Sequence, residues 1–299
     1  MRVFIAGLSG MLGQALAKAL IADGQEVYGC GQKQRAMLDL PSAAVYQCYS
    51  FGGWELETIA DLVGTADIVI NAAAYTKVDQ AELEELEAYR VNALFAGLLA
   101  RICELKDCDL AYISSDYVFD GKANRPYREH AMPNPLSAYG RSKLAGEIAS
   151  RRIPRHYVIR TSWLFGESGA NFVKTVCKLA KERTELRIVD DQFGCPTYAQ
   201  DLAVAMARLI KTGRYGTYHL TNKGMANWFE LACEIVTQLN LPVTVLGQST
   251  AEARRLAPRP AFGVLDNWAW QIAGEPPLPC WQDALGRYLN VAASGSLAR

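Results

Sequence analysis

The expected fold follows from one segment near the N-terminus, RVFIAGLSGMLGQALAKALIA, at residues 2–22. Residues 2–6 are a short apolar run typical of a buried strand, and residues 11–22 carry apolar side chains at helical spacing. The glycines Gly7, Gly10 and Gly13 join the two elements. Glycine lets the backbone approach a pyrophosphate, which the amides of a helix N-terminus then bind. The segment predicts a dinucleotide-binding turn, with an ordinary tight turn as the alternative.

Strands and helices alternate in the residues that follow. Apolar runs predict strands at 26–30, 67–71, 109–114 and 157–161, and helical patterns occupy 54–62 and 78–106 and begin again near Tyr139. This alternation predicts an α/β fold, a Rossmann-type doubly wound parallel sheet with helices on both faces.

The pattern changes after residue 161. Helices are predicted at 171–183, 199–211 and 226–239, with strands at 186–189 and 217–220. We therefore expect a dinucleotide-binding Rossmann domain at 1–161, to which later segments at about 186–222 return. Residues 162–299 are expected to form mainly a smaller C-terminal α/β substrate lobe.

The composition excludes several classes of protein. The 299 residues are 50% hydrophobic and 21% charged, with a formal net charge of zero, so no global field attracts nucleic acid or an anionic membrane. No apolar run is long enough to span a bilayer, and the N-terminus reads as a strand rather than a signal peptide, which predicts a cytoplasmic protein. The eight cysteines contain no C-x-x-C pair and do not cluster with the three histidines, which favours reduced thiols without a metal.

Tyr139 and Lys143, in the segment YGRSK, form the candidate catalytic pair. Residues four apart share one helix face, and an ammonium at about 4 Å stabilises a phenolate by roughly 4 kcal/mol at an effective dielectric of 20. That energy would lower the phenol pKa by up to about three units, toward the range where general acids work best. Ser115, at the end of a strand, could share the same substrate oxygen. A chain of this composition is expected to contain about half a Tyr-x-x-x-Lys pair by chance, so a pair without a catalytic role is the alternative.

The end of the second strand indicates which dinucleotide is bound. An NAD site usually places a carboxylate there, but the segment GCGQKQR at 29–35 has no acid, and the next one is Asp39. Lys33 or Arg35 could instead meet a 2′-phosphate, which predicts NADPH over NADH, although NADH stays possible. Ordinary solvated loop charges are the alternative for both residues.

Six further motifs resemble one family within the extended short-chain dehydrogenase/reductases. They are similar to the dTDP-4-dehydrorhamnose reductase family over nearly the whole chain, in NAAAYTKVDQAE (71–82), SSDYVFDG (114–121), RTSW (160–163), NFVKT (171–175), DQFGCPT (191–197) and RPAFGVLDN (259–267). The resemblance implies NADPH-dependent reduction of the C4 ketone of dTDP-4-dehydro-β-L-rhamnose to dTDP-L-rhamnose.

The resemblance also implies residue roles. Tyr139 would protonate the developing alkoxide, Lys143 would bind the nicotinamide ribose, and Ser115 stands where the family usually has threonine. The cofactor site would be lined by Gly7, Gly10, Met11, Leu12, Gly13, Asp39, Leu40, Ala72, Ala73 and Ala74. The dTDP-sugar would contact Ser115, Asp116, Trp163, Gln192, Pro196, Thr197 and Arg259.

The chain departs from the family at a few positions. Glutamates that bind Mg²⁺ at a dimer interface in some members correspond to Ala15 and Gln200, so we expect no metal and a monomer or weak homodimer. Gly263 replaces a family serine, which removes one phosphate donor. Two other functions stay open: a sister dTDP-4-keto-6-deoxysugar reductase of different stereochemistry, or a non-catalytic nucleotide-binding regulatory subunit like methionine adenosyltransferase beta.

Overall fold

One parallel sheet organises the N-terminal half of the molecule. The structure, a computed structural model, describes residues 1–49 and 55–295. Seven parallel strands lie in the order β3-β2-β1-β4-β5-β6-β11. The strand order reverses between β1 and β4, because β2 and β3 are added on one side of β1 and the later strands on the other. These strands are β1 (Arg2–Ala6), β2 (Glu26–Gly31), β3 (Val45–Cys48), β4 (Ile68–Asn71), β5 (Asp109–Ser115), β6 (His156–Thr161) and β11 (Gly216–His219). The predicted Rossmann-type sheet is confirmed.

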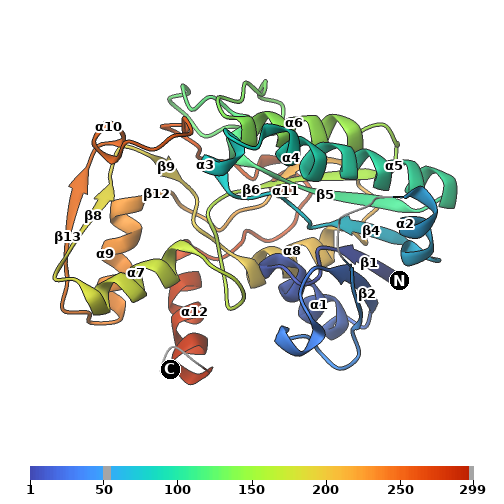
Figure 1. Ribbon diagram of the computed structural model, residues 1–299, viewed down its shortest axis with the longest axis horizontal. Helices are drawn as coiled ribbons and strands as arrows, with labels where there is room; N and C mark the ends of the chain where they lie inside the picture. The colour runs from blue at the N-terminus through green and yellow to red at the C-terminus, as the bar shows by residue number, and fades with distance from the viewer. Residues whose placement is uncertain (50–54, 296–299) are drawn as a thin grey trace.

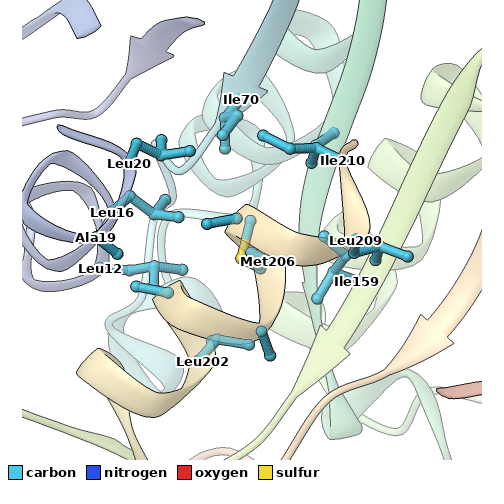
Figure 2. Packing of buried hydrophobic residues seen from close by; sticks show 14 of the residues in the cluster. Leu12, Leu16, Ala19, Leu20, Ile70, Ile159, Leu202, Met206, Leu209 and Ile210 are labelled. Carbon is cyan, nitrogen blue, oxygen red and sulfur yellow. The ribbon is translucent and has the colours of Figure 1, made fainter. Parts of the chain in front are cut away.

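Helices cover both faces of the sheet because its strands are apolar on both sides. α1 (Met11–Ala22) and α8 (Ala199–Leu209) cover one face, and α2 (Leu56–Val63), α5 (Phe95–Lys106) and α6 (Ala138–Ser150) cover the other (Figure 1). Ile70 of β4 and Ile159 of β6 pack against Leu16 of α1 and Met206 of α8 (Figure 2). Neighbouring strand residues such as Val69 point to the opposite face, as the two-residue period of a strand requires.

A second lobe with its own core follows the sheet in the sequence (Figure 1). Phe165, Leu186, Leu231 and Tyr288 belong to this core. Its helices are α7 (Phe172–Glu182), α9 (Trp228–Gln238) and α12 (Trp281–Gly295), with the short α10 (Thr250–Ala253). Its strands pair two by two, as β7 (Leu164–Phe165) with β10 (Thr197–Tyr198), β9 (Phe193–Gly194) with β12 (Ala226–Asn227), and β8 (Glu185–Val189) with β13 (Thr244–Gln248).

The segment 186–222 returns to the nucleotide-binding sheet only in part. α8 and β11 lie on and in that sheet, and α11 (Trp268–Ile272) joins them by burying Trp270 in the same core. β8 instead pairs with β13 in the second lobe. The return therefore begins at α8, later than the sequence pattern indicated.

The helical segment predicted at 78–106 is helical over most of its length but is not continuous. The segment divides into α3 (Val78–Ala81), α4 (Glu85–Tyr89), a π-helical turn at Arg90–Leu94, and α5. The π turn places Asn92 inside the molecule, where its amide bonds the backbone of Tyr75 and, at 2.9 Å, the hydroxyl of Ser142. A buried amide must be hydrogen-bonded, and π turns mark such exceptions to a regular helix. The helix predicted at 54–62 begins at Leu56, and Trp54 lies outside the described residues.

The described chain also contains two short 3-10 turns, η1 (Arg35–Met37) after β2 and η3 (Asp116–Val118) after β5. Both follow the carboxyl ends of strands, where the ligand crevice of a doubly wound sheet lies. None of the helices in the described ranges is long and apolar enough to cross a membrane.

Candidate active site

The glycine turn lies where the strand order reverses. Gly7 has a φ of +85°, and a Cβ there would lie 2.5 Å from the backbone nitrogen of Ala73. A Cβ on Gly13 would lie 2.3 Å from the carbonyl oxygen of Gly7. Gly10 caps α1 through its backbone, without a capping side chain from the described residues, and Leu12 is buried in the core. The N-terminus of α1 therefore begins directly after a closely packed glycine turn, the arrangement in which helix amides can bind a pyrophosphate.

The end of β2 packs directly against this turn. A Cβ on Gly31 would lie 2.2 Å from the Ser9 hydroxyl oxygen. Lys33 is exposed, and Arg35 donates through Nη2 to the carbonyl of Pro41 at 3.0 Å. Nη1 of Arg35 is buried and has no hydrogen-bond partner among the described residues.

Asp39 does not occupy the position of an NAD-type acid. Its carboxylate accepts from Lys18 at 2.6 Å, and its amide donates to Gln14 at 2.9 Å, so α1 holds this residue from the side. Leu40 packs against the α1 core, and Ala72 and Ala74 are less buried than Ala73. The cationic end of β2 is thus left without a neighbouring carboxylate from its own loop.

The structure brings Ser115, Tyr139 and Lys143 together in a nearly closed environment. Their exposed fractions are 8%, 9% and 2%. Ser115 ends β5, while Tyr139 and Lys143 lie one turn apart on α6. Ser137 caps α6 by accepting from the amide of Gly140 at 3.1 Å. Glu82 accepts from the amide of Ala138 at 2.8 Å, so this glutamate also stabilises the start of α6.

The predicted lowering of the Tyr139 pKa is wrong for this arrangement. Burial raises the pKa of Tyr139 to about 12, although a hydrogen bond with Ser115 acts in the opposite direction. The Lys143 ammonium does not contact the phenol: it donates to the carbonyl of Ile113 at 2.5 Å and lies 4.4 Å from the ring centroid of Tyr112. Tyr139 is therefore a neutral phenol at neutral pH, which is the form that can donate a proton.

The burial of Lys143 predicts that the use of NADPH depends on pH. Burial lowers its pKa to about 7, so the ammonium present below that pH is lost above it. If the ammonium helps to bind the cofactor ribose, kcat/KM for NADPH should fall as the pH rises through about 7. Asp116 has a pKa of about 7 as well, so Lys143→Arg, which stays charged, is the control that should remove this decline. A rate that stays constant across this pH range would contradict the prediction.

Asp116 and Arg259 approach the catalytic group from two sides. Asp116 is buried, accepts from the Ser115 hydroxyl at 2.8 Å, and has Gly263 beside its Oδ2, where a Cβ would lie 2.8 Å away. Arg259 forms an ion pair with Asp79, at 2.8 Å and 3.0 Å, and hydrogen-bonds Tyr117. The segment beginning at Arg259 is thus close to the catalytic tyrosine, because Tyr117 contacts the Tyr139 ring edge-on at 5.4 Å between centroids.

The remaining predicted substrate residues lie on the lobe side. Trp163 has a φ of +47° and stacks on Trp228 with ring centroids 3.5 Å apart. Gln192 donates to the Thr250 hydroxyl at 2.8 Å. Pro196 and Thr197 are buried, and the Thr197 hydroxyl donates to the carbonyl of Cys195 at 3.0 Å. These two residues therefore stabilise the conformation of their own loop.

One charged cluster was missed from the sequence. Glu147 is fully buried and accepts from Nε and Nη2 of Arg160, each at 2.8 Å, and from the Ser114 hydroxyl at 2.6 Å. Arg151 adds a contact at 2.8 Å from the partly exposed side. Glu147 follows Lys143 by four residues and so continues the face of Tyr139 and Lys143, a spacing that could have identified it.

Comparison with known proteins places this geometry in a family. The model of the RmlD substrate binding domain matches residues 1–294. The chain belongs to the RmlD substrate binding domain family. The spore coat polysaccharide biosynthesis protein SpsK of Bacillus subtilis is 38% identical over 294 residues, covering 98% of each chain. The dTDP-4-dehydrorhamnose reductase of Aggregatibacter actinomycetemcomitans is 36% identical, covering 95% of this chain and 97% of its own.

A solved member of the RmlD family shows the same fold. The dTDP-4-dehydrorhamnose reductase of Bacillus anthracis, in complex with NADP, superposes with a TM-score of 0.87 at 38% identity, covering 97% of this chain and 99% of its own. The predicted family is confirmed, and the predicted enzyme class agrees with the names of these relatives. In the ranges that the structure describes, no cluster of three or more His, Cys, Asp or Glu side chains could hold a metal ion.

Proposed function

We propose that this protein reduces the C4 ketone of dTDP-4-dehydro-β-L-rhamnose to dTDP-L-rhamnose with NADPH. One observation carries the proposal: Ser115 at the carboxyl end of β5 meets Tyr139 and Lys143 of α6, in a chain that is 36% identical to a dTDP-4-dehydrorhamnose reductase over 95% of its length. We further propose a cytoplasmic enzyme that is a monomer or weak homodimer.

The glycine turn fits a dinucleotide. Gly7 and Gly13 leave no room for a Cβ, so the turn packs the start of α1 closely against the end of β4, as in a dinucleotide-binding turn. When bound there, NADPH would supply a hydride to the substrate carbon. Lys143 would donate to the ribose hydroxyls, and the end of β2 would meet the adenosine ribose.

Side chains of the protein would supply the proton that the reduction needs. Hydride addition at C4 turns the carbonyl oxygen into an alkoxide, and Tyr139 donates its phenolic proton to that oxygen. An alkoxide is a stronger base than a phenolate, so the transfer is favourable even with a phenol pKa of about 12. Ser115 would hydrogen-bond the same oxygen and position it for the transfer.

The decisive experiment is an NADPH-oxidation assay on a panel of dTDP-4-keto-6-deoxysugars, with the C4 configuration of each product determined by NMR. The proposal expects the highest kcat/KM for dTDP-4-dehydro-β-L-rhamnose and dTDP-L-rhamnose as product. A different preferred sugar or the opposite configuration would indicate a sister reductase. No turnover of any panel member, with dinucleotide still bound, would indicate a non-catalytic nucleotide-binding subunit.

The charge at the end of β2 predicts a cofactor preference. Lys33 is exposed there and Arg35 has a buried donor atom without a described partner, whereas Asp39 is paired with Lys18. We expect a higher kcat/KM for NADPH than for NADH, because the 2′-phosphate would occupy this cationic position. Steady-state kinetics with both cofactors at fixed substrate measure it, and a clear NADH preference would overturn the prediction.

Arg259→Ala should raise KM for the dTDP-sugar and change kcat much less. The guanidinium is proposed to contact the dTDP portion, which does not react, so its removal weakens ground-state and transition-state binding alike. Arg183→Ala, at an exposed arginine of the second lobe, is the control that should leave KM unchanged. A fall in kcat with unchanged KM would show that Arg259 acts on the reaction instead.

A further inference from the structure

The second lobe places a cation beside the cofactor end of the sheet, and the proposed function does not use it. We propose that Lys174 of α7 and Lys33 after β2 together bind a phosphate monoester on the adenosine ribose of the dinucleotide. The inference rests on the proposed use of NADPH. It adds that the second lobe, and not only the nucleotide-binding sheet, recognises the 2′-phosphate.

Two loops from different lobes pack on the same glycine turn. On one side, Gly31 at the end of β2 lies against Ser9, where a Cβ would come within 2.2 Å of the hydroxyl oxygen. On the other side, Gly166 lies over Met11, with its Cβ position 3.2 Å from Met11 Cγ. Lys33 follows Gly31 by two residues, so each loop brings a lysine close to this turn.

The ammonium of Lys174 is fixed beside the Gly166 loop. Nζ donates to the carbonyl of Glu167 and, at 3.1 Å, to the carbonyl of Gly169. The backbone amide of Lys174 donates at 3.0 Å to Asn171, which caps α7. These contacts use two of the three ammonium donors and hold the side chain over its own loop, and no residue that the structure describes accepts a hydrogen bond from the third donor.

Two lysines lie close to each other at this position. Burial lowers the pKa of Lys174, the carboxylate of Glu167 raises it and the neighbouring Lys33 lowers it, so the two ammonium groups are close enough to repel. Arg35 follows Lys33 by two residues, and its buried Nη1 has no hydrogen-bond partner among the described residues.

The acids of the two loops have partners of their own. The carboxylate of Glu167 attracts Lys174 and also accepts from the Tyr198 hydroxyl, and the carboxylate of Asp39 is paired with Lys18. A phosphate monoester carries close to two negative charges and three acceptor oxygens, so it can bind several cations at once. Bound between Lys33 and Lys174, it would replace repulsion with two attractions and connect the lobes.

The test measures dissociation constants of NADPH and NADH for the full chain and for Lys174→Gln, with Lys178→Gln one turn later as the exposed control. Loss of one charge-assisted contact should raise the Kd of Lys174→Gln for NADPH about tenfold. The Kd for NADH should stay within about twofold. Lys178→Gln should bind both cofactors as the unmodified chain does. Adenosine 2′,5′-bisphosphate, used as a fragment probe against AMP, should show the same selective loss.

The outcomes separate this inference from the proposed function. Unchanged NADPH affinity, or an equal loss for NADPH and NADH, would overturn the role of Lys174 while leaving the reductase proposal intact. Binding of neither dinucleotide by the unmodified chain would overturn the proposed function itself. Should Lys174→Gln fail to fold, Lys33→Gln and Lys174→Arg replace it, and the inference then requires an NADPH-selective loss for the first and retained selectivity for the second.

Discussion

Tyr139→Phe is expected to lower kcat by roughly 10²–10⁴, the usual span for a lost general acid, with little change in NADPH affinity. The substitution removes one hydroxyl from a buried ring and leaves the edge-on contact with Tyr117, at 5.4 Å between centroids, in place. The phenol would be the proton source for the C4 alkoxide, so its loss acts on the chemical step. Single-turnover rates at saturating cofactor and substrate measure the effect directly.

Tyr117→Phe is the matched control for this prediction. Its ring lies in the same aromatic contact, but its hydroxyl hydrogen-bonds Arg259 and is not the proposed proton donor. We expect its effect on kcat to be at least about ten times smaller, because a single hydrogen bond contributes only about 1 kcal/mol net. If Tyr139→Phe kept near wild-type turnover, the donor would be another group, and buried Asp116, with a pKa of about 7, would be the next to test.

Arg160→Met should lower the free energy of unfolding by about 3–5 kcal/mol, the usual cost of breaking a buried ion pair. Arg160 is 1% exposed and Glu147 is 0% exposed, and two bonds of 2.8 Å join them. Without the guanidinium, the buried Glu147 carboxylate loses these two hydrogen bonds and the positive charge that offsets its burial. Urea denaturation followed by far-UV circular dichroism measures the change.

Two variants control for the location of the charge. Arg151→Ala removes the other arginine that contacts Glu147, but this side chain is 36% exposed, so the loss should be no more than about 1 kcal/mol. The double variant Arg160→Met with Glu147→Leu removes both charges and should recover part of the stability lost by the single change. Equal losses for Arg160→Met and Arg151→Ala would show that burial does not decide the cost of this pair.

Much of the fold could be predicted from local sequence patterns. The glycine turn between a short apolar run and an amphipathic helix predicts the first βα unit, because backbone conformation and hydrophobic period are properties of neighbouring residues. A serine directly before a helix is a local signal of the same kind, and Ser137 caps α6 with a bond of 3.1 Å. The family motifs predict the positions of Ser115, Tyr139 and Lys143, since their spacing reflects one strand end and one helix face.

Contacts between distant residues could not be predicted in this way. The helical segment at 78–106 changes to a π turn where Asn92 bonds Tyr75 and Ser142, which are 17 and 50 residues away. β8 was expected to return to the nucleotide-binding sheet, but it pairs with β13, which comes much later in the chain. Arg259 meets Asp79 across 180 residues, and no periodicity in the sequence indicates that pairing.

The sequence by itself determined the Rossmann sheet, the glycine turn and the choice of the candidate catalytic residues. Only the tertiary structure decided their electrostatics. Spacing along a helix placed Tyr139 and Lys143 on one face but gave neither the contacts of the ammonium nor the burial of the two groups. Burial raises the pKa of Tyr139 to about 12 and lowers that of Lys143 to about 7. The physical reason is that desolvation depends on every element packed around a group, whereas a motif describes only the residues within it.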